Sequence, residues 1–417
     1  MLCRFCKEEL KDVFIDLVNS PPSNSFLTRQ QLNEPEVFFP LKVYTCNNCF
    51  LVQVDEYKKS DAIFDDEYVY FSSFSSSWLA HAKKYTEKMI DRFGFSDKSQ
   101  VIEIASNDGY LLQYFKQKNI PVLGIEPTAN TAKVAQEKGI ESITEFFGTR
   151  LAKKLVDQGR KADLLLGNNV LAHVPDIVDF IAGMKLILKE GGIITMEFPH
   201  LMQLVDNNQF DTIYHEHYSY LSFTTVQKVF AAHGLEMFDV EEQPTHGGSL
   251  RIFAKNAADK SKEISPNVAK MLKMEADAGM LTDAYYKNFQ QRVNAIRNAF
   301  WKFLIDSQEK GKKVIGYGAA AKGNTLMNYA GVKGDDLISF VVDAAPSKQN
   351  KFLPGTHIPV YDQSKIREFK PDYVIIFPWN LKEEVMNQLS YINEWGGQFV
   401  TFIPKLQIAK ASLEKVA

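Results

Sequence analysis

The sequence lacks the features that would place it in a membrane, outside the cell or on nucleic acid. It contains no run of about 18 apolar residues, which excludes a transmembrane helix. Its start, MLCRFCKEEL, carries charges where a secretory signal would have an apolar core. The 48 Lys and Arg do not outnumber the 51 Asp and Glu, so a formal charge of −3 provides no general attraction to nucleic acid or to an anionic membrane. We therefore expect a cytoplasmic protein that binds neither nucleic acid nor a membrane.

Cysteine and histidine are also scarce, with four and eight residues respectively among 417. The cysteines form two close pairs, which is not the scattered framework of a disulfide-rich secreted protein. Aromatic residues are plentiful, and 30 Phe and 17 Tyr argue against disorder. At roughly 150 residues per domain, the chain is long enough for two or three domains with cores of their own.

Both cysteine pairs have Cys-x2-Cys spacing, which indicates a metal site formed by Cys3, Cys6, Cys46 and Cys49. This spacing lets both sulfurs of a pair reach one zinc ion at about 2.3 Å, and two pairs complete a tetrahedron. Four cysteines leave no open coordination position, so we expect one structural zinc ion. The alternatives are unrelated reduced cysteines or a redox pair, but neither pair lies in a thioredoxin-like pattern.

From residue 100 onward, apolar strands alternate with helical segments, which predicts an α/β fold with a doubly wound parallel sheet. The expected strands are 101–104, 122–126, 163–167 and 192–198, and then, in a smaller second α/β unit, 314–318, 338–343, 373–377 and 399–402. Residues 256–310, between the two units, are largely helical in pattern and predict a connector packed on one face. The residues that show the apolar periodicity are Tyr286, Phe289, Val293, Ile296, Phe300 and Phe303. The predicted domains are a zinc-binding domain (1–65), a first α/β domain (66–255), a helical connector (256–310) and a C-terminal α/β domain (311–417).

A turn of small residues between the strand 101–104 and a helix predicts a cofactor site. Small side chains let a ligand approach the backbone, and an acidic residue at the end of the next strand, Glu126, can accept hydrogen bonds from ribose hydroxyls. Only Gly109 is a glycine, so the turn is not G-x-G-x-x-G. This weakens a dinucleotide interpretation and favours S-adenosylmethionine, although an ordinary turn without a cofactor is the alternative. The candidate cofactor-binding residues are Glu103, Ala105, Ser106, Asn107, Gly109, Glu126, Pro127, Asn168 and Asn169.

The segment 210–220 concentrates two histidines, one glutamate and three tyrosines. Histidine exchanges protons near neutral pH, and a neighbouring carboxylate can orient it. Tyr214 and His217 would share a face on a helical turn, whereas His215 and His217 would do so only in an extended segment. The pattern is not His-Glu-x-x-His, so the helical zinc-protease geometry is absent. Packing of an aromatic-rich segment is the alternative to a catalytic site.

Three further positions are candidates for ligand contacts. His173 follows the third strand, at the sheet edge where α/β proteins bind ligands, although a structural role is equally compatible. His246–Arg251 is either a turn into an edge strand or an anion-binding loop. A second turn, Gly316–Asn324, again joins a strand to a helix and precedes Asp343, which is a moderate dinucleotide signal. Lys322, near the start of that helix, could instead meet a diphosphate.

Taken together, the motifs resemble the S-adenosylmethionine-dependent sugar C-3′-methyltransferases, which act on nucleotide-linked 4-keto-deoxysugars. The motifs are the two cysteine pairs, EIASNDGYLL with GIEPTANTA, NNVLAHVPD, DTIYHEHYSYLS, HGGSLR, and GYGAAAKGNTLMN followed by VVDAAPSKQNKFLPGTHIPV. The resemblance covers nearly the whole chain. It implies a class I methyltransferase domain, flanked by a small N-terminal zinc-binding domain and a C-terminal Rossmann-like domain that contributes to nucleotide-sugar binding.

The resemblance also implies a mechanism in branched-chain deoxysugar biosynthesis. His217, oriented by Glu216, would be the general base that removes the C3 proton made acidic by the C4 ketone, with Tyr214 as a relay or stabilising group. His173 and one of Tyr68 and Tyr70 would hydrogen-bond the enolate oxygen. His215, Arg251, Lys322 and Asn324 would contact the thymidine or guanosine diphosphate sugar. The resemblance leads us to expect a monomer.

Other functions fit parts of the sequence. An O- or N-methyltransferase acting on a small molecule also uses a base but needs no ketone. A zinc-ribbon RNA methyltransferase is disfavoured because the chain has no basic stripe laced with aromatic residues. A non-catalytic binding module would not require His217.

Overall fold

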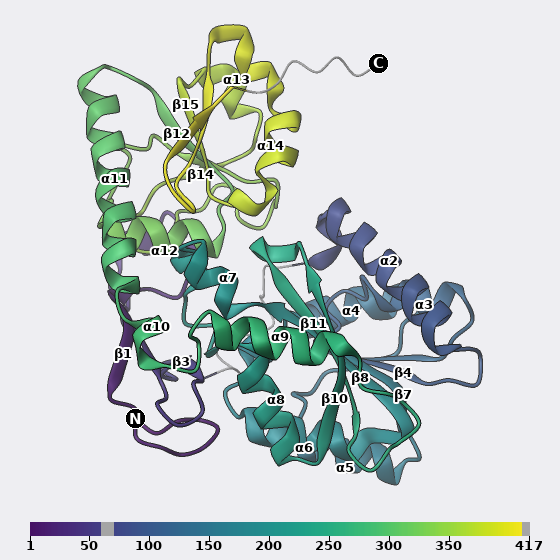
Figure 1. Cartoon of the computed structure of the whole chain (residues 1–417). Helices are drawn as coiled ribbons and strands as arrows, with labels where there is room; N and C mark the ends of the chain where they lie inside the picture. Colours follow the sequence, from purple (N-terminus) through teal and green to yellow (C-terminus); the bar gives the residue numbers. More distant parts are fainter. Residues whose placement is uncertain (60–70, 411–417) are drawn as a thin grey trace. The chain divides into compact units, whose positions relative to one another are not determined.

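The computed structural model describes residues 1–59 and 71–410, which form two compact units (Figure 1). Each unit is assembled from three separate stretches of chain. Unit 1 contains Met1–Asp12, Thr45–Met202 and Glu216–Tyr285, and unit 2 contains Val13–Tyr44, Gln203–His215 and the chain from Tyr286 onward. Both cysteine pairs therefore lie in unit 1, together with the first α/β sheet.

Unit 1 is built on a seven-stranded sheet with the order β10-β11-β8-β7-β4-β5-β6. The five strands from β4 to β8 pair in parallel, as predicted, and β11 is antiparallel to both β8 and β10. The strands are β4 (Val101–Ile104), β5 (Val122–Ile125), β6 (Ser142–Ile143), β7 (Ala162–Asn168), β8 (Leu188–Pro199), β10 (Leu235–Gln243) and β11 (Ser249–Asn256).

Helices cover both faces of this sheet (Figure 1). One face packs against α2 (Ser76–Phe93), α3 (Leu112–Gln117) and α4 (Ala129–Glu137), and the other lies against α5 (Thr149–Asp157), α6 (Ile177–Ile187) and α8 (Phe223–Ala232). Leu164 and Leu166 of β7 join the core on the α2 side, while the equally buried Leu165 points to the opposite face. This burial on both faces explains why the strands are continuously apolar.

Unit 2 has a six-stranded sheet with the order β14-β13-β12-β15-β16-β17. All neighbours pair in parallel except β17, which is antiparallel to β16. The chain runs from β12 outward to β14 and then returns to β15 on the other side of β12, so the switch in strand order lies between β12 and β15. The strands are β12 (Val314–Tyr317), β13 (Val341–Val342), β14 (Val360–Tyr361), β15 (Tyr373–Ile376), β16 (Gln398–Thr401) and β17 (Gln407–Ala409).

Short elements complete the two units. In unit 1, β3 (Val52–Val54) pairs with β9 (Ser219–Tyr220), and α9 (Pro266–Asp277) packs on β10. In unit 2, β1 (Asp12–Ser20) lies beside β2 (Phe39–Thr45). The remaining helices are α7 (Leu201–Asp206), α10 (Asp283–Tyr286), α11 (Phe289–Glu309), α12 (Ala321–Ala330), α13 (Lys365–Phe369) and α14 (Lys382–Gln388).

The predicted helical segment between the two sheets is confirmed, and its apolar stripe is buried. Tyr286 and the five apolar α11 residues that define the periodicity are all less than 10% exposed. Phe300 and Phe303 pack against Phe402 with ring centroids 4.8 and 5.6 Å apart. Helix α11 is therefore part of unit 2, whereas α9 belongs to unit 1.

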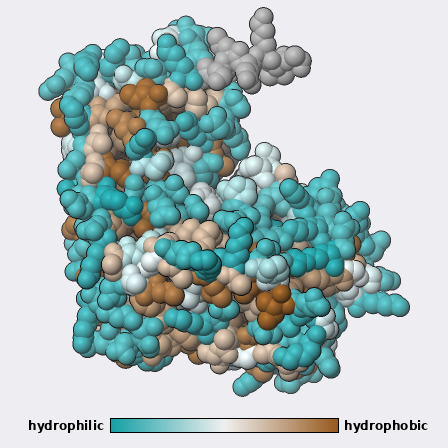
Figure 2. Space-filling model, in the orientation of Figure 1, coloured by the Kyte–Doolittle hydropathy of each residue, from teal (hydrophilic) through white to brown (hydrophobic). Residues whose placement is uncertain are grey.

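The surface is predominantly polar on the face drawn in Figure 2, where apolar residues form separate patches. Within residues 1–59 and 71–410, no helix combines the length and the hydropathy needed to cross a membrane.

Candidate active site and zinc site

The four cysteine sulfurs converge in unit 1. All four Sγ atoms lie within 4.8 Å of one another, with 3.6 Å between Cys3 and Cys49 and 3.5 Å between Cys6 and Cys46. Tetrahedral ligands with Zn–S bonds of about 2.3 Å stand about 3.8 Å apart. The tetrad therefore fits a zinc ion held by four thiolates, with no position left for a substrate.

Each cysteine pair is closed by the same local fold. The Lys7 N–H donates to the Cys3 carbonyl at 3.0 Å, and the Phe50 N–H donates to the Cys46 carbonyl at 2.8 Å. Lys7 and Phe50 both adopt left-handed backbone angles, with φ of 63° and 62°. Gln53 Nε2 also donates to Cys3 Sγ at 3.2 Å, which supports a thiolate at that position.

A cavity with about 1020 Å³ of empty space, its mouth included, lies at the carboxyl ends of β4, β5 and β7. Parallel sheets typically bind ligands at this edge. Six of the nine predicted cofactor-binding residues line it, together with His173. They are Ala105, Asn107, Glu126, Pro127, Asn168 and Asn169.

The turn after β4 adopts backbone angles that usually require glycine, although it contains only one glycine. Ala105, Asn107 and Gly109 all lie in the left-handed region, with φ of 56°, 48° and 75°. Asparagine tolerates this region, but alanine adopts it at a cost of about 1–2 kcal/mol. The turn thus keeps the tight path typical of a cofactor-binding loop without the glycine pattern.

Glu126 fixes this turn while lining the cavity. Its Oε2 accepts from the Asn107 N–H at 2.9 Å, and its Oε1 accepts from the Thr128 N–H at 2.9 Å and from Thr128 Oγ1 at 2.5 Å. Burial raises the pKa of Glu126, and these hydrogen bonds oppose the rise. A carboxylate held in this way presents its remaining lone pairs to a ligand in the cavity.

The other three predicted cofactor residues do not line the cavity. Glu103 is completely buried, and burial raises its pKa well above the usual value. Ser106 packs beneath the turn against Gly124, where an added Cβ would lie 2.5 Å from Ser106 Oγ. Gly109 faces Ile140 at a distance that would exclude a side chain. These residues support the turn from below.

His246, the first residue of the predicted turn or anion-binding loop, lines the cavity. The wall also contains aromatic rings that were not predicted. They come from segments far apart in the sequence, so no local pattern joins them, and the only signal was the position of Trp78 at the start of an amphipathic helix. The unpredicted rings are Trp78, Tyr110, Phe146, Phe147 and Phe180.

His173 brings the Tyr-His segment to the cavity. Its ring centroid lies 4.6 Å from that of His217 at an angle of 74°, and both residues are in unit 1. Burial lowers the pKa of His173 to about 4, opposed by a hydrogen bond to the backbone of Glu216. His217 and Glu216 are themselves buried, 6% and 4% exposed. An imidazole and a neighbouring carboxyl group therefore lie beside the cavity wall.

The other members of the segment are placed differently. Residues 215 and 216 form a turn, so Tyr214 and His217 do not share a helical face. Tyr214 and His215 belong to unit 2, where His215 Nε2 lies 3.1 Å from the Pro40 carbonyl and its ring packs on Phe39. Tyr68 and Tyr70 lie outside the described residues.

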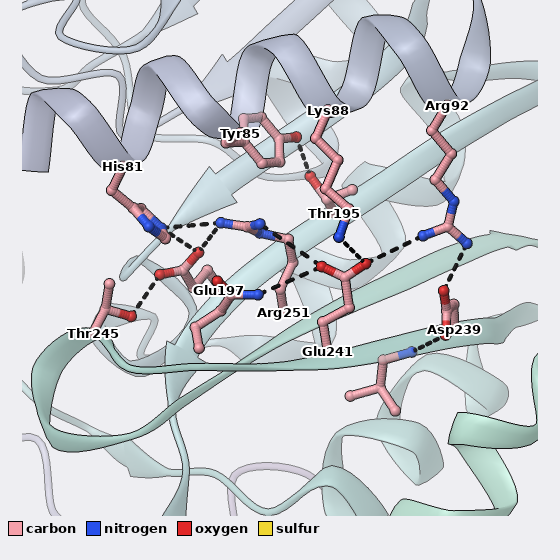
Figure 3. Close-up of polar contacts among 12 residues, drawn as sticks. His81, Tyr85, Lys88, Arg92, Thr195, Glu197, Asp239, Glu241, Thr245 and Arg251 are labelled. Carbon is pink, nitrogen blue, oxygen red and sulfur yellow. Dashed lines mark hydrogen bonds and ion pairs between the residues drawn. The ribbon is translucent and has the colours of Figure 1, made fainter.

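Arg251 does not line the cavity but lies in a buried ionic network (Figure 3). It stands opposite Glu197 across the β11–β8 pairing, and its Nη2 donates to Glu197 Oε2 at 2.5 Å. His81 Nε2 contacts the same oxygen at 2.9 Å, and Thr245 Oγ1 donates to Glu197 Oε1 at 2.8 Å. Of the two alternatives for His246–Arg251, a turn into an edge strand was wrong, because β11 lies between β8 and β10 and the buried charge of Arg251 is neutralised by Glu197.

Unit 2 gathers polar side chains where its strand order switches. Lys322, at the start of α12, donates to Asn380 Oδ1 at 2.6 Å and lies 4.3 Å over the Trp379 ring. Trp379 Nε1 donates to Asp211 Oδ2 at 2.7 Å. Burial lowers the pKa of Lys322 to about 8 and raises that of Asp211 to about 7. Asn324 is turned away from this group and donates to the Ser23 carbonyl.

Asp343, the acidic residue that follows the second glycine turn, accepts hydrogen bonds from the backbone. Asp343 Oδ2 accepts from the Ala319 N–H and Oδ1 from the Ala345 N–H, each at 2.8 Å. Lys348 Nζ lies 3.5 Å from Oδ2. Asp343 therefore holds the second glycine turn and the residues after β13 in place, much as Glu126 holds the turn after β4.

Comparisons with known proteins match successive parts of the chain to three family models. The first describes a domain proposed to bind zinc and matches residues 3–64, and the second describes a methyltransferase domain and matches residues 78–240. The third describes a C-methyltransferase C-terminal domain and matches residues 244–404. The C-methyltransferase NovU of Streptomyces niveus is 33% identical over 412 residues, which cover 98% of this chain and 97% of that protein.

Two further similarities are confined to part of the chain. A ubiquinone biosynthesis O-methyltransferase of Chelativorans sp. (strain BNC1) is 30% identical over 96 residues, 23% of this chain and 38% of that protein. The crystal structure of magnesium protoporphyrin IX methyltransferase from Synechocystis PCC 6803 with bound S-adenosylmethionine is 14% identical, with a TM-score of 0.33. It covers 42% of this chain and 78% of that one.

Proposed function

We propose a substrate and a mechanism for this chain, which belongs to the family of S-adenosylmethionine-dependent C-methyltransferases. Unit 1 carries the class I methyltransferase fold, S-adenosylmethionine is the cofactor, and the four cysteines form a zinc site. The proposed acceptor is C3 of a nucleotide-linked 4-keto-6-deoxy sugar. The observation that carries the proposal is the contact between His217 and the cavity-lining His173.

His217 acts as the general base. A ketone at C4 makes the C3 proton acidic, and transfer of this proton to the imidazole leaves an enolate with negative charge shared by C3 and the C4 oxygen. When bound, with its ribose at Glu126, S-adenosylmethionine would supply an electrophilic methyl group on its sulfonium sulfur. Transfer of that methyl group to C3 would restore the C4 ketone and leave S-adenosylhomocysteine. General base catalysis of this kind contributes about 10²–10⁴-fold.

His173 positions the base. At neutral pH it is uncharged, because its pKa is lowered to about 4 by burial, and a neutral imidazole has one N–H to donate. The hydrogen bond to the Glu216 backbone uses that N–H. In this arrangement His173 holds the Glu216–His217 turn at the cavity and does not donate to the enolate oxygen. Tyr68 or Tyr70 takes the role of oxyanion donor in the proposal, and Tyr214 that of a relay.

Unit 2 binds the nucleotide. Lys322 is a cation at the switch in strand order, and the Trp379 ring and the Asn380 amide beside it are typical groups for recognising a nucleoside diphosphate. His215 and Asn324 are engaged with the backbone of Pro40 and Ser23, and in the proposal they shape this region. Arg251 has a structural role, because Glu197 already neutralises it.

The test is a deuterium-exchange and methylation assay. We would incubate the enzyme with thymidine or guanosine diphosphate 4-keto-6-deoxy sugars in heavy water, with and without S-adenosylmethionine, and analyse the sugars by mass spectrometry. We expect deuterium at C3 without the cofactor and, with it, a C-methylated product with S-adenosylhomocysteine. His217→Ala should lower both rates by about 10²–10⁴-fold.

His233→Ala is the matched control, since His233 belongs to the end of α8 and bonds the Val229 carbonyl. It should leave both rates unchanged. Methyl transfer to oxygen, or equal turnover of the 4-hydroxy sugar, would contradict C-methylation of a ketosugar and favour O-methylation.

A further inference from the structure

The strand order gives the cavity a direction. Glu126 directly follows β5, and Phe146 and Phe147 come after β6, so these residues occupy the β5–β6 side. The turn containing Ala105 and Asn107 is next, at the end of β4. His246 precedes β11, beyond β7 and β8, and therefore lines the cavity from the opposite side. An elongated ligand with its ribose at Glu126 must extend its other end towards His246.

A row of rings connects His246 to the β4 turn. Trp78 stacks on Tyr110, which directly follows Gly109, with centroids 5.8 Å apart and planes at 21°. Trp78 also contacts the His246 ring, with centroids 5.2 Å apart. The imidazole thus lies next to the part of the cavity where the β4 turn approaches a ligand.

The backbone at His246 is strained. Its φ of 54° is left-handed, and Gly247 and Gly248 continue with φ of 89° and 116°. Left-handed angles in a non-glycine residue are unfavourable and cluster at ligand-binding sites, where the surroundings enforce them.

The buried network of Figure 3 enforces this geometry. Glu197 binds Thr245, the residue before His246, through Oε1 at 2.8 Å, and it contacts His81 through Oε2 at 2.9 Å. His81 in turn stacks on Trp78 with ring centroids 5.1 Å apart and planes at 15°. One carboxylate therefore anchors both the loop of His246 and the helix of Trp78.

The charges that line the cavity indicate which ligand group binds at the end near His246. Among the described residues that line the cavity there is no Lys or Arg, and the bases are His173 and His246. Glu126 repels a second carboxylate at the β5 side. We infer that His246 binds the carboxylate of the methionine part of S-adenosylmethionine, with Trp78 as the wall against which that part lies. This assignment rests on the proposed placement of the ribose at Glu126.

The experiment measures binding of two ligands by titration calorimetry, without any acceptor sugar. S-adenosylhomocysteine has the amino-acid carboxylate, whereas 5′-methylthioadenosine has the same adenosine and thioether without it. His246→Gly and His246→Asn both suit a left-handed backbone, so they remove the imidazole without adding strain. We expect each to weaken S-adenosylhomocysteine about tenfold and 5′-methylthioadenosine less than about twofold.

Glu126→Gln is the matched control, and it should weaken both ligands because both contain the ribose. Unfolding temperatures of all variants would be compared with that of the original protein, and two His246 variants guard against a folding defect in one. Equal weakening of both ligands by the His246 variants, or of neither, would overturn the assignment. Failure of the sugar assay described above would leave this result untouched, since no sugar takes part.

Discussion

At the scale of single residues, the turn after β4, the predicted cofactor site, depends on backbone angles that its composition does not suggest. Ala105 has a φ of 56°, a position at which related loops carry glycine in many α/β proteins. The methyl group of Ala105 lines the cavity, and Glu126 ties the next residues of the turn in place. The hydrogen bonds around the turn therefore keep Ala105 in this unfavourable conformation.

Replacing Ala105 by glycine tests this strain. Ala105→Gly should raise the free energy of unfolding by about 0.5–1 kcal/mol, because relief of the left-handed penalty outweighs the greater entropy of glycine in the unfolded chain. Urea unfolding monitored by tryptophan fluorescence would measure it. Ala152→Gly, in the interior of α5, is the matched control and should lower stability by about 1 kcal/mol. A loss of stability in Ala105→Gly would contradict the strain.

At the scale of elements, Glu197 connects α2, β8 and the loop before β11. Burial alone would raise its pKa, but the hydrogen bond from His81 and the charges of Arg251 and His81 outweigh burial and lower the pKa to about 2. Arg251 also lies 4.7 Å over the Tyr85 ring of α2. The network therefore contributes to the packing of α2 on the sheet.

The lowered pKa has a defined consequence for stability. A carboxyl group whose pKa falls from 4.5 to about 2 on folding stabilises the protein fully above pH 4.5, and this contribution is lost as the pH falls towards 2. Glu197→Gln should lower the free energy of unfolding at pH 7 by about 3 kcal/mol and flatten its decline between pH 4.5 and 2. Urea unfolding across this pH range would measure both effects.

Glu145→Gln is the control for an exposed ion pair. Glu145 contacts Lys154 and Arg150 at the surface, and its loss should change stability by at most about 1 kcal/mol. Equal losses of unfolding free energy in the two variants would contradict the predicted stabilisation by the buried Glu197 network.

At the scale of the whole molecule, the zinc site links distant parts of unit 1. It joins residues 3–6 to residues 46–49, and β3 then pairs with β9, directly after the segment that contains His217. Arg4 also donates to the carbonyls of Val54 and Pro175. A zinc ion at this site therefore supports the architecture around His217 and has no open position for chemistry.

Removing the zinc should unfold the N-terminal region. We expect a strong chelator to release one zinc ion per chain, to expose residues 1–59 to limited proteolysis and to lower activity in proportion, with recovery when zinc is returned. Metal analysis, proteolysis and the methylation assay would follow the three events. A fully folded, zinc-free protein without activity would instead indicate a catalytic metal.

Much of the fold could be predicted because the signals are local. The strand 101–104 was predicted with the bounds of β4, and the apolar stripe of α11 is buried at every predicted position. The cysteine tetrad was predicted from spacing alone. By contrast, an edge position for the strand after His246, one of two alternatives for that segment, was wrong, because nothing near Arg251 in the sequence reveals the counter-charge of Glu197, 54 residues earlier.

The sequence by itself determined the alternation of strands and helices, the zinc ligands, the cofactor turn and the family, since hydrophobic periodicity and short motifs depend on neighbouring residues. Only the tertiary structure decided that His173 meets His217, that Trp78 and His246 wall the cavity, and that Arg251 is neutralised inside the sheet. These contacts join residues separated by 44 to 168 positions. They depend on strand order and on the packing of helices over the sheet, and no local pattern carries that information.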